Sequence, residues 1–181
     1  MPSWVRTDAA ADRPRAWLVG VRLDAESAGA PDLYTLYLDA ERPVATAGSI
    51  IFISDPALAG AALARDDDPA VRDMAIPDQV EIVYDVPMAL YLIASENVDR
   101  DAIVVNVLNV LFDLLKATGV PWIASVKDVL YPFADHLTFS QEFGTYLDAV
   151  SGRRQEVVNA VLWGIGAVAS HATVLRDADP G

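Results

Sequence analysis

Two histidines are the side chains best suited to acid–base chemistry in this chain of 181 residues, because histidine titrates nearest to neutral pH. His136 directly follows Asp135 and lies six residues before Glu142, so a catalytic site would combine His136 with one of these carboxylates. Neighbouring residues on a helix point about 100° apart, however, so Asp135 and His136 do not form a dyad by themselves. His171 and His136 both have apolar neighbours, which is more typical of core histidines.

Nucleophilic and phosphate-binding motifs are missing from the sequence. A hydrolase serine would lie on a sharp turn within Gly-x-Ser-x-Gly, and no such stretch occurs. Ser125, Ser140 and Ser170 are each near a histidine in the sequence, but only the fold could align them. Cysteine is absent, which excludes thiolate nucleophiles and cysteine-based metal sites. The sequence contains neither of the glycine-rich phosphate-binding motifs G-x-x-x-x-G-K-[ST] and G-x-G-x-x-G, so nucleotide binding through such a loop is not expected.

Three consecutive carboxylates, Asp66, Asp67 and Asp68, are the strongest candidates for metal ligands, because Ca²⁺ and Mg²⁺ prefer oxygen. The run lacks the alternating spacing, the glycine and the glutamate of an EF-hand loop. We therefore interpret it as the exposed end of a helix, and we expect no metal and no other cofactor. Acidic residues at that end oppose the helix dipole, a cost that binding of a cationic group would offset.

Aromatic side chains crowd the segment 122–146, which contains Trp122, Tyr131, Phe133, Phe139, Phe143 and Tyr146. Such a group usually fills the core between helices, and we expect it to do so here. It could instead line a ligand pocket. In that case the ligand-binding candidates are Trp122, Tyr131, Phe139 and Tyr146.

The charge balance argues against several partners. Lysine and arginine number 13 against 26 aspartates and glutamates, and only Lys116 and Lys127 are lysines. Nucleic-acid binding depends on clustered basic residues, so neither nucleic acid nor an anionic membrane is an expected partner. Between Asp55 and Asp101 there are 11 acidic and 3 basic residues. We interpret this excess as a solvated face, with a surface for a basic protein as the alternative.

The residue pattern predicts an α+β fold in which a mixed sheet of about four strands packs on a C-terminal layer of four to five helices. Residues 1–14 read as a flexible tail, and 15–176 as a single domain that is sheet-rich over 15–86 and helical over 87–176. Three strands, at 16–23, 33–39 and 44–54, should run antiparallel. A helix at 57–64, starting at Asp55-Pro56, leads to a fourth strand at 80–86, which we expect to lie parallel to the third.

Helices are predicted for the rest of the chain. Asp85-Pro87 starts one at 88–95, and Asp99 starts a long one at 100–119. Two more follow, at 122–137 with a break near Pro132, and at 139–152 with Ser140 as its cap. The last covers 156–175.

Residues 157–175 carry no charge, and these 19 residues are close to the roughly 20 that a membrane span needs. A polar stripe argues for a buried helix of a soluble domain instead. The stripe comprises Asn159, Trp163, Gly166, Ser170 and Thr173, and the opposite, apolar stripe Val158, Leu162, Ile165, Val168 or Ala169, Ala172 and Leu175. The small residues Gly164, Gly166, Ala167 and Ser170 should let another helix approach closely; we expect that helix to be 100–118, with a homodimer partner as the alternative.

These patterns favour a non-catalytic protein that acts through protein contacts. It would work as a homodimer or as an acidic, immunity-like partner that covers a basic protein. The start of the chain has no apolar stretch typical of a secretory signal, which with the lack of cysteine favours the cytoplasm. The alternative is a small-molecule-binding protein or metal-independent enzyme with a pocket near residues 122–146, using His136 with Asp135 or Glu142.

Overall fold

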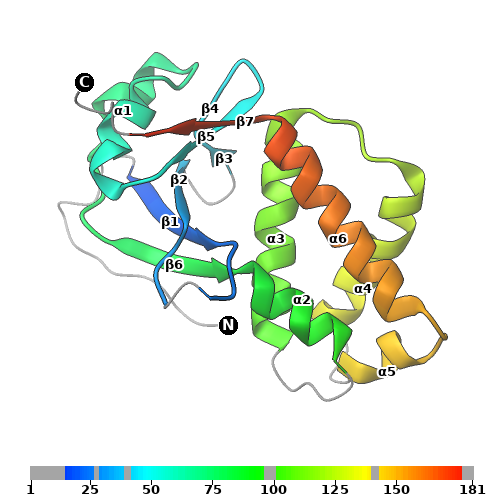
Figure 1. Cartoon of the computed structure of the whole chain (residues 1–181). Helices are drawn as coiled ribbons and strands as arrows, with labels where there is room; N and C mark the ends of the chain where they lie inside the picture. Colours follow the sequence, from blue (N-terminus) through cyan, green and yellow to red (C-terminus); the bar gives the residue numbers. More distant parts are fainter. Residues whose placement is uncertain (1–14, 27–28, 39–41, 96–100, 140–142, 177–181) are drawn as a thin grey trace.

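The computed structural model describes residues 15–26, 29–38, 42–95, 101–139 and 143–176, and within them the chain forms a mixed sheet of seven strands and six α-helices (Figure 1). The strands are β1 Ala16–Arg22, β2 Leu33–Leu38, β3 Arg42–Pro43, β4 Ala45–Thr46, β5 Ser49–Ile53, β6 Val80–Asp85 and β7 Ala172–Leu175. The helices are α1 Ala59–Leu63, α2 Val86–Ala94, α3 Asp101–Thr118, α4 Ala124–Phe139, α5 Phe143–Asp148 and α6 Arg153–Ser170, with short 3-10 turns η1 Pro56–Leu58 and η2 Pro69–Asp73. The predicted α+β class is confirmed.

The central strands of the sheet follow the order β4-β5-β2-β1-β6. β1 and β5 both run antiparallel to β2, as the sequence predicts for the first three strands. β6 is parallel, also as predicted, but its partner is β1 and not β5. The expected place beside β5 is taken by β7, which pairs with it in parallel from Ile50 to Ile53.

β7 is the largest departure from the predicted elements, because residues 172–175 were expected to continue the last helix. The helix ends at Ser170, and Ala172–Leu175 turns back along β5. Two backbone bonds flank the pairing, from Ile50 N to His171 O at 2.8 Å and from Ser54 N to Leu175 O at 3.0 Å. Thr173 and Val174 are β-branched and suit a strand, and the backbone bonds to β5 outweigh the helical pattern.

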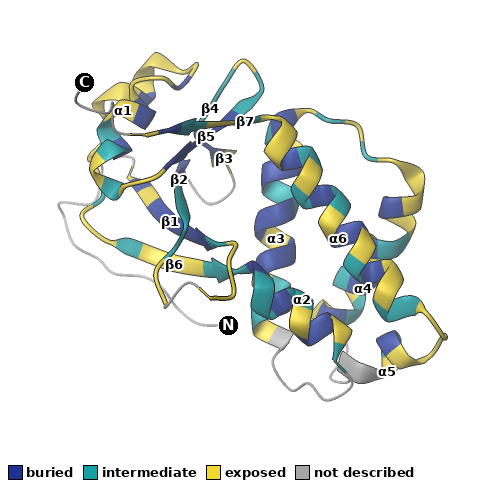
Figure 2. Cartoon of the chain, viewed as in Figure 1, coloured by how far each residue is buried: buried dark blue, intermediate teal, exposed yellow. Residues whose placement is uncertain are grey.

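The two faces of the sheet bury different cores (Figure 2). Alternate residues of a strand point to opposite faces, so Val19 and Val21 face the helical layer while Leu18 faces the other side. α3 lies against the sheet, α2 and α6 contact α3, and α4 packs on α6. The small layer of α1 covers the second face, where Ile51 and Ile53 are buried.

Both predicted strand–cap–proline–helix passages are confirmed. The Asp55 carboxylate accepts a hydrogen bond from Ala57 N at 2.8 Å at the start of η1, and Asp85 accepts one from Met88 N at 3.0 Å at the start of α2. Each carboxylate satisfies an amide that has no partner inside its helix. The predicted caps Asp99 and Ser140 lie outside the described residues.

Pro132 does not break its helix, contrary to the sequence prediction, and α4 continues through it to Phe139. Proline removes one helical hydrogen bond, which leaves the carbonyl of Asp128, four residues earlier, without its usual partner. Both Pro132 and Asp128 are exposed, so water can satisfy that carbonyl. The helix expected at 139–152 is shorter and spans Phe143–Asp148.

α6 buries a stripe that shares Val168 with the predicted one but otherwise differs from it. Its buried residues are Val157, Ala160, Val161, Gly164 and Val168. Leu162, expected on the buried side, is 48% exposed, and Gly166 and Ser170 face solvent instead of a neighbouring helix. Of the small residues, Gly164 does meet α3 as predicted, at Leu111. Across the described part of the chain, no helix combines the length and hydropathy needed to cross a membrane.

Candidate functional site

His136, the histidine proposed for acid–base chemistry, lies in an aromatic group at the α4–α5 end of the molecule. The half-buried His136 ring lies 5.2 Å, centroid to centroid, from the Tyr146 ring. Tyr146 also stacks on Phe133 at 5.6 Å and carries the Arg153 guanidinium 4.6 Å above its ring. Asp135 is exposed on α4, and Glu142 lies outside the described residues. The described geometry therefore shows the His136 ring packed beside Tyr146.

The four aromatic ligand candidates do not converge on one pocket. Trp122 and Tyr131 join Phe112 of α3, with ring centroids 5.2 to 5.6 Å apart. These three rings line a hollow of about 350 Å³ together with Asp113 and Lys116. Tyr146 belongs to the separate group at His136, and Phe139 is 85% exposed.

Asp66, Asp67 and Asp68 tie the loop after α1 to the β3–β4 segment. Asp66 is buried, contrary to the exposed helix end that we predicted, and its carboxylate accepts hydrogen bonds from Arg42 Nη1 at 3.1 Å and Ala45 N at 3.2 Å. The Asp67 carboxylate accepts from Thr46 Oγ1 at 3.0 Å and from Ala47 N at 2.7 Å. The three carboxylates therefore bind their own backbone and an arginine.

Asp68 caps η2 by accepting a hydrogen bond from Ala70 N at 2.9 Å. This bond gives Asp68, like Asp66 and Asp67, a structural role. Among the described residues, no group of three or more histidine, aspartate or glutamate side chains is arranged to hold a metal ion.

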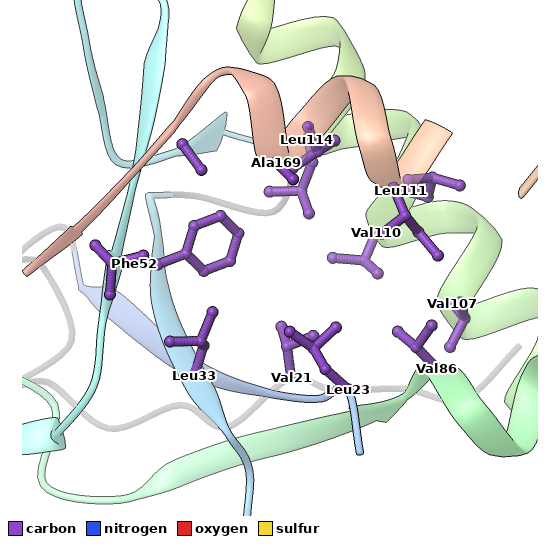
Figure 3. A pocket seen from close by; sticks show the side chains of 14 residues that line it. Val21, Leu23, Leu33, Phe52, Val86, Val107, Val110, Leu111, Leu114 and Ala169 are labelled. Atoms are coloured by element: carbon purple, nitrogen blue, oxygen red, sulfur yellow. The ribbon is translucent and has the colours of Figure 1, made fainter. Parts of the chain in front are cut away.

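Among the hollows that the described residues line, the one between the sheet and the helices α3 and α6 has the most apolar walls (Figure 3). This apolar cavity has a volume of about 210 Å³. Its walls are Val21, Leu23, Leu33, Phe52, Val86, Val107, Val110, Leu111, Leu114, Ile165, Val168, Ala169, Ala172 and Val174. Figure 3 shows the side chains of β1, β2 and β5 on one side and those of α3 on the other, directed at a common space.

The local sequence explains why the cavity is apolar and why it stays open. Val107, Val110, Leu111 and Leu114 of α3 are spaced by three, one and three residues, so they form one face of the helix. Where α6 gives way to β7, the wall is made by Ala169 and Ala172, whose single methyl groups leave space that larger side chains would fill. The cavity opens to the molecular surface at Leu23, which is 47% exposed, and at the exposed Ala169.

Among the described residues, no titratable side chain lines the apolar cavity. The sequence does not single out the residues that form it, because a valine beside a void has the same sequence pattern as a valine beside another side chain. Of the wall residues, only Ala169 and Ala172 are small enough to indicate unfilled volume. Alanine is also common in well-packed helices, so this signal is weak.

A buried phenol lies beneath α3, near Asp113. The Tyr37 hydroxyl is buried and makes no hydrogen bond within the described residues. Burial raises the pKa of Tyr37 far above its ordinary value of 10.0, and the negative charge of Asp113 raises it further. Tyr84 is affected in the same way, with burial again the main cause of its raised pKa and Asp113 the second. Both phenols are therefore neutral over the physiological pH range.

Comparison of the chain with protein-family models, with curated proteins and with solved structures finds no match.

Proposed function

We propose that this protein binds a small organic molecule in the apolar cavity. The observation that supports the proposal is a space of about 210 Å³ walled by fourteen apolar residues and open at Leu23 and Ala169. Protein interiors are close-packed, and voids larger than a water molecule are few. A molecule in the cavity would restore the dispersion contacts that its walls now lack.

The proposed activity is binding without a chemical step at this site. General acid–base catalysis requires a titratable group within hydrogen-bond reach of the reacting atoms, and the wall residues that the structure describes include none. Small-molecule binding is also the alternative function that the sequence predicts. The sequence predicts the pocket near residues 122–146, whereas the pocket proposed here lies between the sheet and α3.

A thermal shift experiment on the full chain tests the proposal, with toluene as the probe. A ligand at about 100 times its dissociation constant stabilises a protein by about 2.7 kcal/mol, which in a chain of this size raises Tm by roughly 5–10 °C. The variant Ala169→Leu fills part of the cavity and should remove the shift. The matched control Ala61→Leu makes the same change on the exposed side of α1 and should keep it. A toluene shift that is the same in both variants would contradict the proposal.

Contact with a basic protein is the second candidate function. The outer layer over residues 55–81 exposes six carboxylates against two cations, Arg65 and Arg72. The carboxylates belong to Asp55, Asp67, Asp68, Asp73, Asp78 and Glu81. An acidic surface of this kind attracts basic partners at long range, as an immunity-like protein would require, and it disfavours nucleic acid. The sequence also predicts a second copy of the chain as a partner. Sedimentation measures whether the chain forms this homodimer.

Charge-neutral variants test the acidic layer with an octalysine peptide as the probe. Asp73→Asn, Asp78→Asn and Glu81→Gln together should weaken binding of the peptide, most strongly at low salt. The control set Asp128→Asn, Asp135→Asn and Glu156→Gln removes the same charge from α4 and α6. Equal weakening by the two sets would show that only net charge matters, and would overturn this second candidate.

A further inference from the structure

The chemistry of the cavity walls narrows the class of molecule that can bind there. The walls that the described residues form are aliphatic side chains and one phenyl ring, so no described side chain offers a hydrogen bond. On the β5–β7 side, the backbone groups behind them are paired with each other. β5 and β7 pair along Ile50–Ile53, and Ile50 N donates to His171 O. A polar group carried into the cavity would therefore lose its bonds to water without replacement.

The nearest cation along the chain is not available to hold a charged headgroup. Arg22 lies between the wall residues Val21 and Leu23, but neighbours along a strand point to opposite faces, so Arg22 points away from the cavity face. Its Nη1 donates to the Asp85 carboxylate at 2.8 Å, and both side chains are 23% exposed. The charge of Arg22 is thus already compensated by Asp85.

The volume sets an upper size. An apolar cavity of roughly 150 Å³ accommodates a benzene ring. At about 210 Å³ the cavity accommodates a ring with a few additional carbon atoms or a short branched chain. A long acyl chain would extend past Leu23 and Ala169 into solvent.

Building on the proposed function, we infer that the ligand is a small, uncharged, hydrocarbon-like molecule, and that the cavity rejects molecules of similar size whose charged group would have to enter it. The cavity selects against polar ligands because none of the described wall side chains can form a hydrogen bond with a polar group. Apolar pockets discriminate against an added hydroxyl by about a hundredfold at most, and against a full charge far more strongly.

The test compares molecules that share one ring. Toluene, phenol, benzoate and benzylammonium are titrated into the full chain, and binding is followed by the methyl NMR signals of Val110 and Leu114. We expect toluene to bind, phenol to bind about ten- to a hundredfold more weakly, and the two charged probes to leave these signals unchanged. The toluene response should be lost in Ala169→Leu and kept in Ala61→Leu.

The outcomes separate the two proposals. If benzoate or benzylammonium binds as tightly as toluene and Ala169→Leu abolishes that binding, the inferred ligand class is wrong while the cavity remains a binding site. If no probe shifts the signals of Val110 and Leu114, or if Ala169→Leu leaves toluene binding intact, the proposed function itself is wrong.

Discussion

Gly164 of α6 lies directly over Leu111 of α3, so close that a Cβ on the glycine would be 3.0 Å from Leu111 Cδ2 and 3.3 Å from Leu111 Cδ1. Real side chains seldom approach so closely, and the absence of a Cβ sets the distance between the two helices. Leu111 is also a wall of the apolar cavity. One leucine side chain therefore connects the packing of α6 on α3 with the shape of the proposed site.

The variants Gly164→Ala and Gly166→Ala should differ in stability, although they make the same change two residues apart on α6. A Cβ at Gly166 meets nothing within 4 Å, so alanine there should raise the free energy of unfolding by about 0.5–1 kcal/mol through helix propensity. At Gly164 the overlap with Leu111 offsets that gain, and we expect Gly164→Ala to be about 1 kcal/mol or more below Gly166→Ala. Urea denaturation measures both. Equal stabilisation would show that the helices are further apart than described.

Tyr37→Phe should leave the protein as stable as before or stabilise it by up to about 1 kcal/mol. The buried Tyr37 hydroxyl makes no hydrogen bond in the described structure, and removing an unsatisfied buried polar group removes its desolvation cost. The exposed Tyr91 provides a control, since Tyr91→Phe should change stability by less than about 0.5 kcal/mol. A loss of more than 1 kcal/mol in Tyr37→Phe, measured by chemical denaturation, would mean that the hydroxyl has a partner.

Stability should fall with rising pH above about 10, where the tyrosines of the unfolded chain ionise. The pKa of Tyr37 is raised in the folded protein from 10.0, so the folded state keeps a proton that the unfolded state releases. The stability linked to that proton is present below pH 10 and is lost above it, at up to about 1.4 kcal/mol per pH unit for each such tyrosine. Denaturation between pH 9 and 11.5 measures the slope. The slope should be smaller in Tyr37→Phe and unchanged in Tyr91→Phe; identical slopes in both variants would argue against the raised pKa.

Asp66→Ala should destabilise the protein by about 2–3 kcal/mol, because it removes a buried carboxylate whose hydrogen bonds, made to a charged group, contribute about 1.5–3 kcal/mol each. The Asp66 carboxylate accepts from Arg42, from Ala45 N and from Asp68 N. The exposed Asp78 provides the control, and Asp78→Ala should change the free energy of unfolding by less than about 0.5 kcal/mol. Thermal and urea denaturation are sufficient readouts. Similar small effects in both variants would mean that Asp66 is exposed to solvent, as the sequence predicts.

Local chemistry explains which elements the sequence predicts correctly. Asp55-Pro56 and Asp85-Pro87 start helices through bonds within three residues, so the sequence contains all that is needed. The alternation in β1 and β2 likewise reports which residues face a core. The α+β class follows from these local signals.

Distant contacts explain what the sequence does not predict. Residues 172–175 become a strand because β5 presents a free edge, which no local window of sequence contains. Asp66 is buried because Arg42, 24 residues earlier, meets it. The apolar cavity is a property of the distance between layers, and its walls have the pattern of ordinary core, so its position could not be predicted.

The pairing of β7 with β5 also bears on how a nascent chain reaches this fold. Ser49 and Thr173, whose hydroxyls lie 2.9 Å apart, are separated by 124 residues. While the ribosome makes that intervening stretch, one edge of β5 stays without its partner, and an open edge is a template for joining another chain. Closure over such a separation is slow. We therefore expect the newly made chain to depend on chaperones until α6 has emerged and β7 can close the sheet.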